Sequence, residues 1–344
     1  MQHVSKVTNG VIKHRLFEEA IKVFVPLCCD AGDGQVVVLL APTQSGKSMI
    51  LPMVTKALTQ AFVDQRPGAI PIVSLTIETV GDGRAKPKWL GLELLKALRH
   101  PIYQHIGSLD ERDHYVPSRG RDEGSIRIAL KEAFIARCVR RVVLDEGHLL
   151  TRSQNREFRG SILESVKSTC AIDRTLIVAG GYELAYNGLF DSPHFAGRVV
   201  TYDMGHYTSE IKDLVDAWTR ILKTYSAHLD LNPKSLLVDE FSYLLEVTNG
   251  VVGLLDKMLW LAMIQARVSG SKIDKRILRA SSPPTSERKV IALDIERGTD
   301  ALSRQTNVIY SAANSEKTKA HKENQKPFVR SPNRNAAMQV EVDS

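Results

Sequence analysis

The sequence predicts an α/β protein, with a parallel sheet flanked by helices and a small all-helical lid behind it. Two patterns predict the sheet: an apolar run at 36–40 enters a phosphate-loop pattern, and a second apolar run ends in Asp145 and Glu146. From about residue 208 strands stop and helical periodicity takes over. The predicted organisation is a helical segment (1–34), an α/β core (35–205), a helical lid (206–270), a basic linker with short elements (271–312) and a disordered tail (313–344).

The composition is that of a globular chain with a modest basic excess. Of 344 residues, 43% are hydrophobic and 25% are charged, and 46 Lys and Arg against 39 Asp and Glu give a net charge of +7. This excess permits binding to nucleic acid without requiring it. The four cysteines show no metal-ligand spacing, and the first residues contain no apolar leader. We expect a cytoplasmic protein with no membrane association.

The segment before the phosphate loop predicts one helix. Apolar residues recur at helical spacing from about His14 to Cys29, and a glycine-containing turn at 30–34 ends the run. Two interpretations stay open. The helix either packs on the core or covers the adenine base of a nucleotide, because it directly precedes the loop.

The phosphate loop reads Ala41-Pro42-Thr43-Gln44-Ser45-Gly46-Lys47-Ser48. A strand, a tight loop and a helix in this order aim backbone N–H groups and the helix dipole at an anion. Lys47 is placed to reach the β and γ phosphates of ATP, and the Ser48 hydroxyl to ligate Mg²⁺. Ala41 replaces the usual first glycine, a mild departure. The other residues predicted to hold the nucleotide are Thr43, Gln44, Ser45 and Gly46.

Between the phosphate loop and the acidic pair at 145–146, the elements are predicted from apolar periodicity and from helix-breaking residues. The polar stretch at 100–124 shows no pattern of its own, which is typical of a functional or mobile connection. The elements expected around it are a helix at about 47–62, a strand at 70–77, a basic loop at 78–88, and helices at about 89–98 and 126–139.

The second landmark is a short buried strand that delivers Asp145 and Glu146 at its carboxyl end. An open α/β sheet binds its ligands at this edge. Asp145 is expected to hold Mg²⁺, directly or through water, and Glu146 to orient and polarise the attacking water. An ordinary surface Asp-Glu pair is the alternative, and the coupling to the phosphate loop favours catalysis.

Two further strands are predicted at 175–181 and 196–202, with a helix within 151–171 before them. The first strand ends in Gly180 and Gly181, so no Ser, Thr or Asn stands there as a nucleotide sensor. Arg198 stands at the start of the second strand, where an arginine finger can face the γ-phosphate of a neighbouring subunit. A structural salt bridge is the alternative role for Arg198.

The lid is predicted from three successive helices. They are expected at about 210–222, 233–248 and 253–268, the last beginning at a turn of sequence Thr-Asn-Gly-Val-Val-Gly. Hydrolysis of a nucleotide bound between core and lid would change the angle between these two units. The polar tail is expected to be either a solvated end or a short recognition peptide.

These motifs together resemble the AAA+ ATPase regulators of transposition, TnsC and TniB. The resemblance rests on the loop at 41–48, the Val-Val-Leu-Asp-Glu-Gly-His-Leu-Leu strand at 142–150, the strand at 176–184, the segment at 78–101 with its His-Pro stop, and the lid turn at 248–255. It covers roughly residues 10–270. The missing polar sensor and the lack of an arginine at the start of the last lid helix depart from the pattern.

The resemblance implies an AAA+ P-loop core and an ATPase that assembles with ATP into rings or helical filaments on double-stranded DNA. Such proteins link a target selector of the TniQ or TnsD type, sometimes within a CRISPR effector complex, to a transposase of the TnsB/TnsA type. The tail after Ala312 is a candidate docking segment for the transposase. Contacts to DNA would be mainly to phosphates. Candidate DNA-binding residues, each equally compatible with a solvated basic loop, are Arg84, Lys86, Lys88, Arg119 and Arg121.

Four other classes share part of this pattern. A superfamily 2 helicase would need a second RecA-like lobe, and an initiator or loader ATPase of the ORC/Cdc6 kind would need a winged-helix domain after the lid. A switch ATPase that scaffolds secretion or signalling would share core and lid but ignore duplex DNA. A P-loop kinase fits least, because no acceptor pocket is evident.

Overall fold

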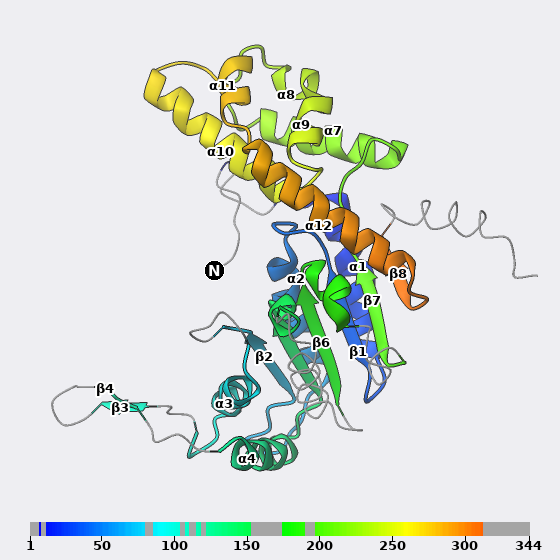
Figure 1. The fold of residues 1–344 in the computed structure, drawn as a ribbon, viewed down its shortest axis with the longest axis vertical. Helices are drawn as coiled ribbons and strands as arrows, with labels where there is room; N and C mark the ends of the chain where they lie inside the picture. Colours follow the sequence, from blue (N-terminus) through cyan, green and yellow to red (C-terminus); the bar gives the residue numbers. More distant parts are fainter. Residues whose placement is uncertain are drawn as a thin grey trace, which may run out of the picture.

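The computed structural model of the chain describes residue 7, residues 12–79, 85–103, 122–152, 174–189 and 197–311, and the short strands at 107–109 and 115–117. Its centre is a six-stranded sheet in the order β2-β5-β6-β1-β7-β8, in which every neighbouring pair is parallel (Figure 1). The strands are β1 (Val36–Leu40), β2 (Ile72–Thr76), β5 (Arg141–Asp145), β6 (Thr175–Gly180), β7 (Val199–Asp203) and β8 (Val308–Tyr310). A separate antiparallel pair is formed by β3 (Gly107–Leu109) and β4 (Tyr115–Pro117).

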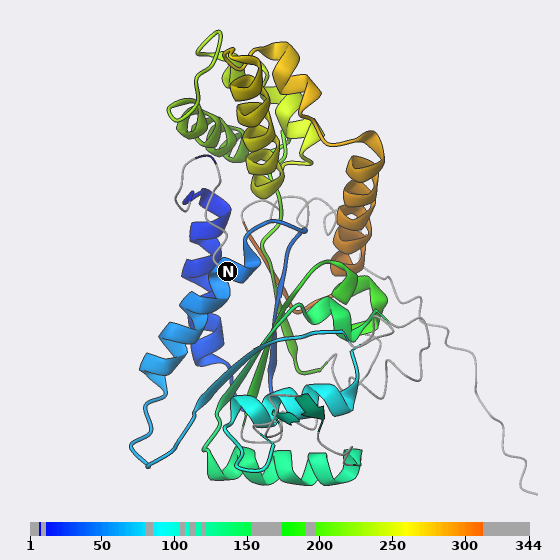
Figure 2. The same cartoon turned by 90° about the vertical axis from the view of Figure 1, so that its left-hand side faces the viewer.

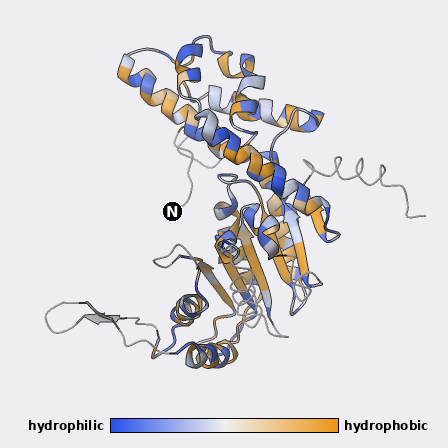
Figure 3. Cartoon of the chain, in the orientation of Figure 1, coloured by the Kyte–Doolittle hydropathy of each residue, from blue (hydrophilic) through white to orange (hydrophobic). Residues whose placement is uncertain are grey.

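Both faces of the sheet are covered, which explains why its inner strands are apolar without alternation. All five residues of β1 are buried. Successive side chains point to opposite faces, so Val37 and Leu39 join one hydrophobic cluster while Val36, Val38 and Leu40 join another. Helices α1 (Arg15–Asp30) and α2 (Lys47–Ala61) cover the first face, and α3 (Pro87–Ala97) and α4 (Glu123–Ala136) the second (Figure 2). Figure 3 shows the apolar strands between these helices.

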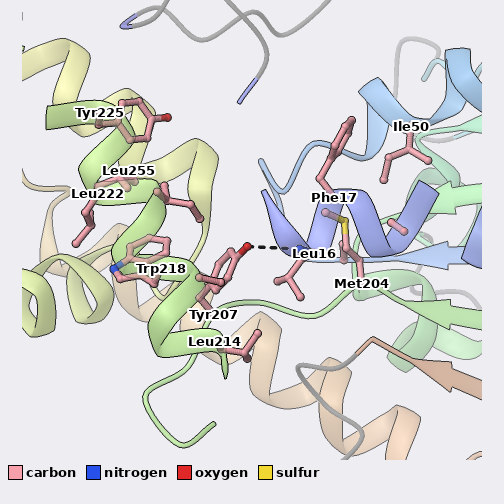
Figure 4. Packing of buried hydrophobic residues seen from close by; sticks show 14 of the residues in the cluster. Leu16, Phe17, Ile50, Met204, Tyr207, Leu214, Trp218, Leu222, Tyr225 and Leu255 are labelled. Carbon is pink, nitrogen blue, oxygen red and sulfur yellow. Dashed lines mark hydrogen bonds between the residues drawn. The ribbon is translucent and has the colours of Figure 1, made fainter. Parts of the chain in front are cut away.

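The lid is continuous with the core through shared hydrophobic packing. Trp218 and Leu222 of the lid belong to the same cluster as Leu16 of α1 (Figure 4). Tyr207 connects them: its ring centroid lies 5.4 Å from that of Trp218, and its hydroxyl accepts a hydrogen bond from the Leu16 N–H at 3.4 Å. The lid helices are α7 (Lys212–Ser226), α8 (Leu236–Asp239), α9 (Phe241–Val247), α10 (Val252–Ser269) and α11 (Lys275–Ala280).

The residues after Gly270 are more ordered than the expected linker. Lys275 and Arg279 of α11 both pair with Glu240, which separates α8 from α9. The hydrogen bond from Lys275 is the main cause that lowers the pKa of Glu240. Lys272 pairs with Asp230 at 3.0 Å. Three basic residues of this segment therefore form ion pairs with acidic residues of the lid.

Helix α12 (Thr285–Ser303) then runs from the lid back to the core, and β8 joins the sheet beside β7 (Figures 1 and 2). The sequence predicts only short elements within 271–312, because exposed apolar residues such as Val290 and Leu293 obscure the helical pattern of α12. On the core side, Gly298 packs against Tyr182: a Cβ at this glycine would lie 2.2 Å from the ring carbon Cγ.

The predicted fold class, a parallel sheet flanked by helices with an all-helical lid, is confirmed. The expected domain boundaries stay predictions. The helix expected within 151–171 and the tail at 313–344 lie outside the described residues. Among the described helices, none alone is long and apolar enough to cross a bilayer; α9 and α10 meet that test only jointly, and a bend of 110° separates them.

Gly298→Ala tests the docking of α12. We expect the free energy of unfolding to fall by about 1–3 kcal/mol, because the new methyl group overlaps the buried Tyr182 ring, although alanine has the higher helix propensity. The measurement is urea denaturation. Gly197→Ala is the control, since a Cβ there meets nothing within 4 Å. An equal or higher stability for Gly298→Ala would contradict this packing.

Candidate nucleotide site between core and lid

The phosphate loop leaves the carboxyl end of the central strand β1 and enters α2 at Lys47. Two of its residues have left-handed backbone conformations, Gln44 at φ 58° and Gly46 at φ 94°. Alternation of right- and left-handed residues turns successive N–H groups into one concavity, which binds anions. Among the described residues, the buried Ser45 hydroxyl finds no hydrogen-bond partner. Such a donor inside an anion-binding loop fits a phosphate ligand.

Lys47 lies folded along the loop that it follows. Its Nζ donates hydrogen bonds to the Ala41 carbonyl at 3.0 Å and the Pro42 carbonyl at 2.7 Å. Burial lowers the pKa of Lys47 to about 8, and the nearby carboxylates of Glu146 and Asp145 act in the opposite direction. The lysine is a desolvated cation within reach of the acidic pair that the sequence singled out, and a phosphate would strengthen its charged form.

The acidic pair stands at the end of β5, two strands from the phosphate loop. Glu146 has a left-handed backbone with φ 57°, and its N–H donates to Asp145 Oδ1 at 2.8 Å. Its carboxylate Oε2 lies 3.2 Å from His148 Nδ1. A strained backbone at the end of a core strand is a feature of functional sites, where it aims a side chain.

Two glycines allow this turn to approach β6. A Cβ at Gly147 would lie 2.2 Å from a Val178 methyl group, and one at Gly180 would lie 2.9 Å from the backbone nitrogen of His148. Gly180, the last residue of β6, therefore has a packing reason. The close approach of the His148 backbone explains why no polar sensor side chain stands at position 180.

These elements enclose a cavity of about 390 Å³ between core and lid. All six residues from Thr43 to Ser48 line it, and so does Glu146. The lid reaches the loop through the first turn of α10, where a Cβ at Gly253 would lie 2.2 Å from the Gln44 carbonyl oxygen. The further lining residues include Ile12, His14, Phe17, His148, Gly181, Glu183, Tyr225, Val252, Asp256 and Asp294.

One side of the cavity is apolar and suits a planar base. Ile12, Phe17 and Val252 line it together with His14. Burial lowers the pKa of His14 to about 4, so its ring is neutral near pH 7, and its Nδ1 lies 3.0 Å from the Tyr207 hydroxyl. Helix α1 also buries Leu16, Phe17, Ala20, Phe24 and Cys28 against the core. The two interpretations of this helix are therefore compatible: it packs on the sheet, and its first turn lines the cavity.

The polar side fits a magnesium nucleotide. Ser48 is exposed to the cavity, and Asp145 is close enough to Lys47 to influence its pKa. Within the part of the chain that the structure describes, no cluster of three or more His, Cys, Asp or Glu residues could hold a metal ion. Ser48 and Asp145 could supply the one or two protein ligands that Mg²⁺ usually takes, with water and phosphate oxygens completing its shell.

The other predicted site residues lie apart from this cavity. Arg198 is exposed directly before β7, and its carbonyl accepts from the Val36 N–H at the opposite edge of the sheet from the loop. Within one subunit it therefore cannot touch the same nucleotide, and its finger role stays a prediction that requires a neighbouring copy. Lys86 is exposed before α3 and Lys88 is half-buried in its first turn. Arg84, Arg119 and Arg121 lie outside the described residues.

Sequence reasoning missed several cavity residues. His148 has a local signal in the sequence, its position two residues after Glu146. Glu183, Asp256 and Asp294 carry no such signal. Asp294 in particular comes from α12, and only the return of this helix to the core brings it to the site.

Replacement of Glu146 by glutamine tests its role as the group that activates water. Hydrolysis of ATP is expected to fall by about 10²–10⁴-fold, because the amide cannot accept the proton, while ADP binding is retained. Single-turnover phosphate release and a fluorescent-ADP titration measure the two effects. Glu132→Gln on α4 is the charge-matched control. Unchanged turnover in Glu146→Gln would assign the base elsewhere.

The lowered pKa of Lys47 predicts a pH dependence of binding. The ammonium form binds phosphate, so nucleotide affinity should be nearly constant below pH 8 and then weaken by up to about tenfold per pH unit above it. Titrations of fluorescent ADP from pH 6.5 to 9.5 measure this. Lys47→Arg, which stays charged, should flatten the profile. A flat profile in the wild-type protein would show that Lys47 does not titrate in this range.

Comparisons with known proteins find distant likeness only. No family model matches the sequence, and no curated protein does. Among solved structures, ORC2 of Aeropyrum pernix with ADPNP and ADP is 14% identical with a TM-score of 0.47, covering 78% of this chain and 68% of that one. Cdc6p of Pyrobaculum aerophilum is 16% identical with a TM-score of 0.48, covering 81% and 68%. A Walker-type ATPase of Pyrococcus abyssi is 14% identical with a TM-score of 0.41, covering 84% and 70%. At these scores the likeness carries no information about substrate or partner.

Proposed function

We propose that this protein is an AAA+ ATPase whose hydrolysis cycle controls an assembly on duplex DNA during transposition. The observation that supports the ATPase is the meeting of three parts at one cavity: the phosphate loop, the turn that bears Glu146, and the first turn of the lid helix α10. A site divided between core and lid can convert the loss of a phosphate into a change of lid angle.

The residues of the site have separate tasks in the proposed reaction. Lys47 and the loop N–H groups would hold the phosphates, and Ser48 and Asp145 would hold Mg²⁺, which supplies Lewis-acid stabilisation of the developing charge. Glu146 would orient water and accept its proton. His148, 3.2 Å from the Glu146 carboxylate, would fix the orientation of that carboxylate.

The role in transposition rests on the sequence resemblance to TnsC and TniB. Under this proposal the protein assembles with ATP into a ring or filament on double-stranded DNA, and it joins a target selector of the TniQ or TnsD type to a TnsB/TnsA-type transposase. Arg198 would complete the site of the next subunit. Lys86 and Lys88, at the start of α3, and the basic residues Arg84, Arg119 and Arg121 would contact DNA phosphates.

Two alternative functions make different demands on the chain. An initiator or loader of the ORC/Cdc6 kind is expected to bind DNA through a separate domain after the lid. A switch ATPase without a DNA role would use the same cavity but show no nucleotide-dependent affinity for DNA.

Sedimentation with random duplex DNA separates an ATPase that assembles on DNA from a switch ATPase. The wild-type protein is expected to co-sediment with DNA in the presence of ATP or a slowly hydrolysed analogue and to remain in solution with ADP or without nucleotide. Lys47→Ala should abolish assembly, and Glu146→Gln should prolong it, because hydrolysis no longer dissolves the complex. Negative-stain imaging distinguishes rings from filaments.

The negative outcomes are equally informative. A protein that hydrolyses ATP but ignores DNA in every nucleotide state would be a switch or scaffold ATPase. Assembly on DNA that does not depend on nucleotide would separate the basic surface from the ATPase cycle.

A further inference from the structure

Helix α12 connects the lid to the core by contacts at both of its ends. At its first turns, Glu287 pairs with Lys257 of the lid at 3.1 Å, and the Arg288 carbonyl accepts from Asn249 Nδ2 at 3.2 Å. At the far end, Gly298 packs on Tyr182, and β8 continues into the sheet. Figures 1 and 2 show the helix crossing from one unit to the other. A helix held in this way transmits a displacement along its axis.

The middle of α12 places Asp294 in the wall of the nucleotide cavity. Its carboxylate Oδ1 accepts a hydrogen bond from the Tyr186 hydroxyl at 2.8 Å. Burial raises the pKa of Asp294 above the usual aspartate value, and the negative charge of Glu183 also raises it. The hydrogen bond from Tyr186 and the nearby Lys47 and His148 side chains lower it. Asp294 thus lines the same cavity as the lysine that is expected to hold the terminal phosphates, and the charges of the two side chains interact.

The charges around the cavity are predominantly negative. Lys47 is the single lysine or arginine among the described residues that line it, whereas four acidic side chains do so, those of Glu146, Glu183, Asp256 and Asp294. Glu146 and its neighbour Asp145 have tasks in the proposed reaction. Glu183 and Asp294 have none, and Asp294 is close enough to Glu183, Lys47 and His148 for their charges to interact. Negative charges beside a phosphate site weaken the binding of the more highly charged ligand.

The opposite side of α12 has room for movement. A second cavity of about 1010 Å³ lies between this helix, α9 and the hinge at 206–209. Its lining includes Ile295, Glu296 and Thr299 from the turns that flank Asp294. If the middle of α12 moved away from the nucleotide, it would move into open space. A packed core on that side would instead resist the movement strongly.

We propose that Asp294 distinguishes a nucleoside triphosphate from a diphosphate by repelling the terminal phosphate, and that α12 carries this response to the lid and to β8. The inference rests on the proposed ATPase function and assigns a specificity and coupling role to a residue outside the nucleotide-binding motifs. With a triphosphate bound, Lys47 is drawn to the phosphate and Asp294 loses its attractive partner while it gains a repulsive one. With a diphosphate bound, that repulsion is smaller, because the added charge is one phosphate further away.

Asp294→Asn tests the charge while it keeps an acceptor for the Tyr186 hydroxyl. The affinities for a non-hydrolysable ATP analogue and for ADP are measured by calorimetry on the full chain. We expect the ratio of analogue affinity to ADP affinity to rise by about tenfold over the wild-type ratio. Asp294→Ser, which also removes the charge, should shift the ratio in the same direction. Glu296→Gln is the control, since it removes one charge from the same helix on the side of the second cavity.

Hydrogen exchange supplies the second readout. In the wild-type protein, exchange of the α12 and β8 amides is expected to differ between the analogue-bound and ADP-bound forms. In Asp294→Asn this difference should be lost, although both nucleotides bind.

The outcomes separate this inference from the proposed function. Failure of the wild-type protein to bind either nucleotide would refute the ATPase itself. Binding of both nucleotides, with an affinity ratio that is unchanged in Asp294→Asn and Asp294→Ser, would overturn the role of Asp294 and leave the ATPase intact. An equal rise of the ratio in Glu296→Gln would show a general effect of net charge and would also overturn it.

Discussion

The close approach of the lid to the phosphate loop is the constraint on which the rest of the structure depends. Gly253 lies against the Gln44 carbonyl oxygen with no room for a Cβ, so the first turn of α10 closes the cavity over the loop. This approach requires the hinge residue Tyr207 to pack between α1 and the lid. One hydrophobic cluster thus extends from the sheet through α1 into the lid, and the angle between the two units is set by packed side chains.

After the lid, the chain returns to the sheet and forms a second connection between the lid and the core. The hinge at 206–209 leads from β7 into the lid, and α12 leads back to β8, the strand beside β7. Two connections that start and end on neighbouring strands restrict the lid more than one hinge does. The second connection, α12, also places Asp294 in the wall of the cavity. The same element that restrains the lid therefore bears a charge that a phosphate can repel.

Charge is distributed unevenly between structural and functional uses. Arg141 donates hydrogen bonds to backbone carbonyls at the end of α1, and Lys275 and Arg279 neutralise Glu240 within the lid. These cations contribute to the net charge of +7 but hold the fold together. Under the proposed DNA role, a surface for DNA phosphates would come from other residues, of which Lys86 at the start of α3 is exposed.

The sequence by itself determined the parts whose chemistry is local. The apolar run of β1, the loop through Lys47 and the acids after β5 are each contiguous, and the sheet and lid follow from hydrophobic periodicity. Only the tertiary structure decided which distant residues share the site. Gly180 is required by the backbone of His148, Gly253 by the Gln44 carbonyl, and Asp294 reaches the cavity because α12 returns to the core. Such close approaches depend on how elements far apart in the chain pack together, and no local pattern encodes them.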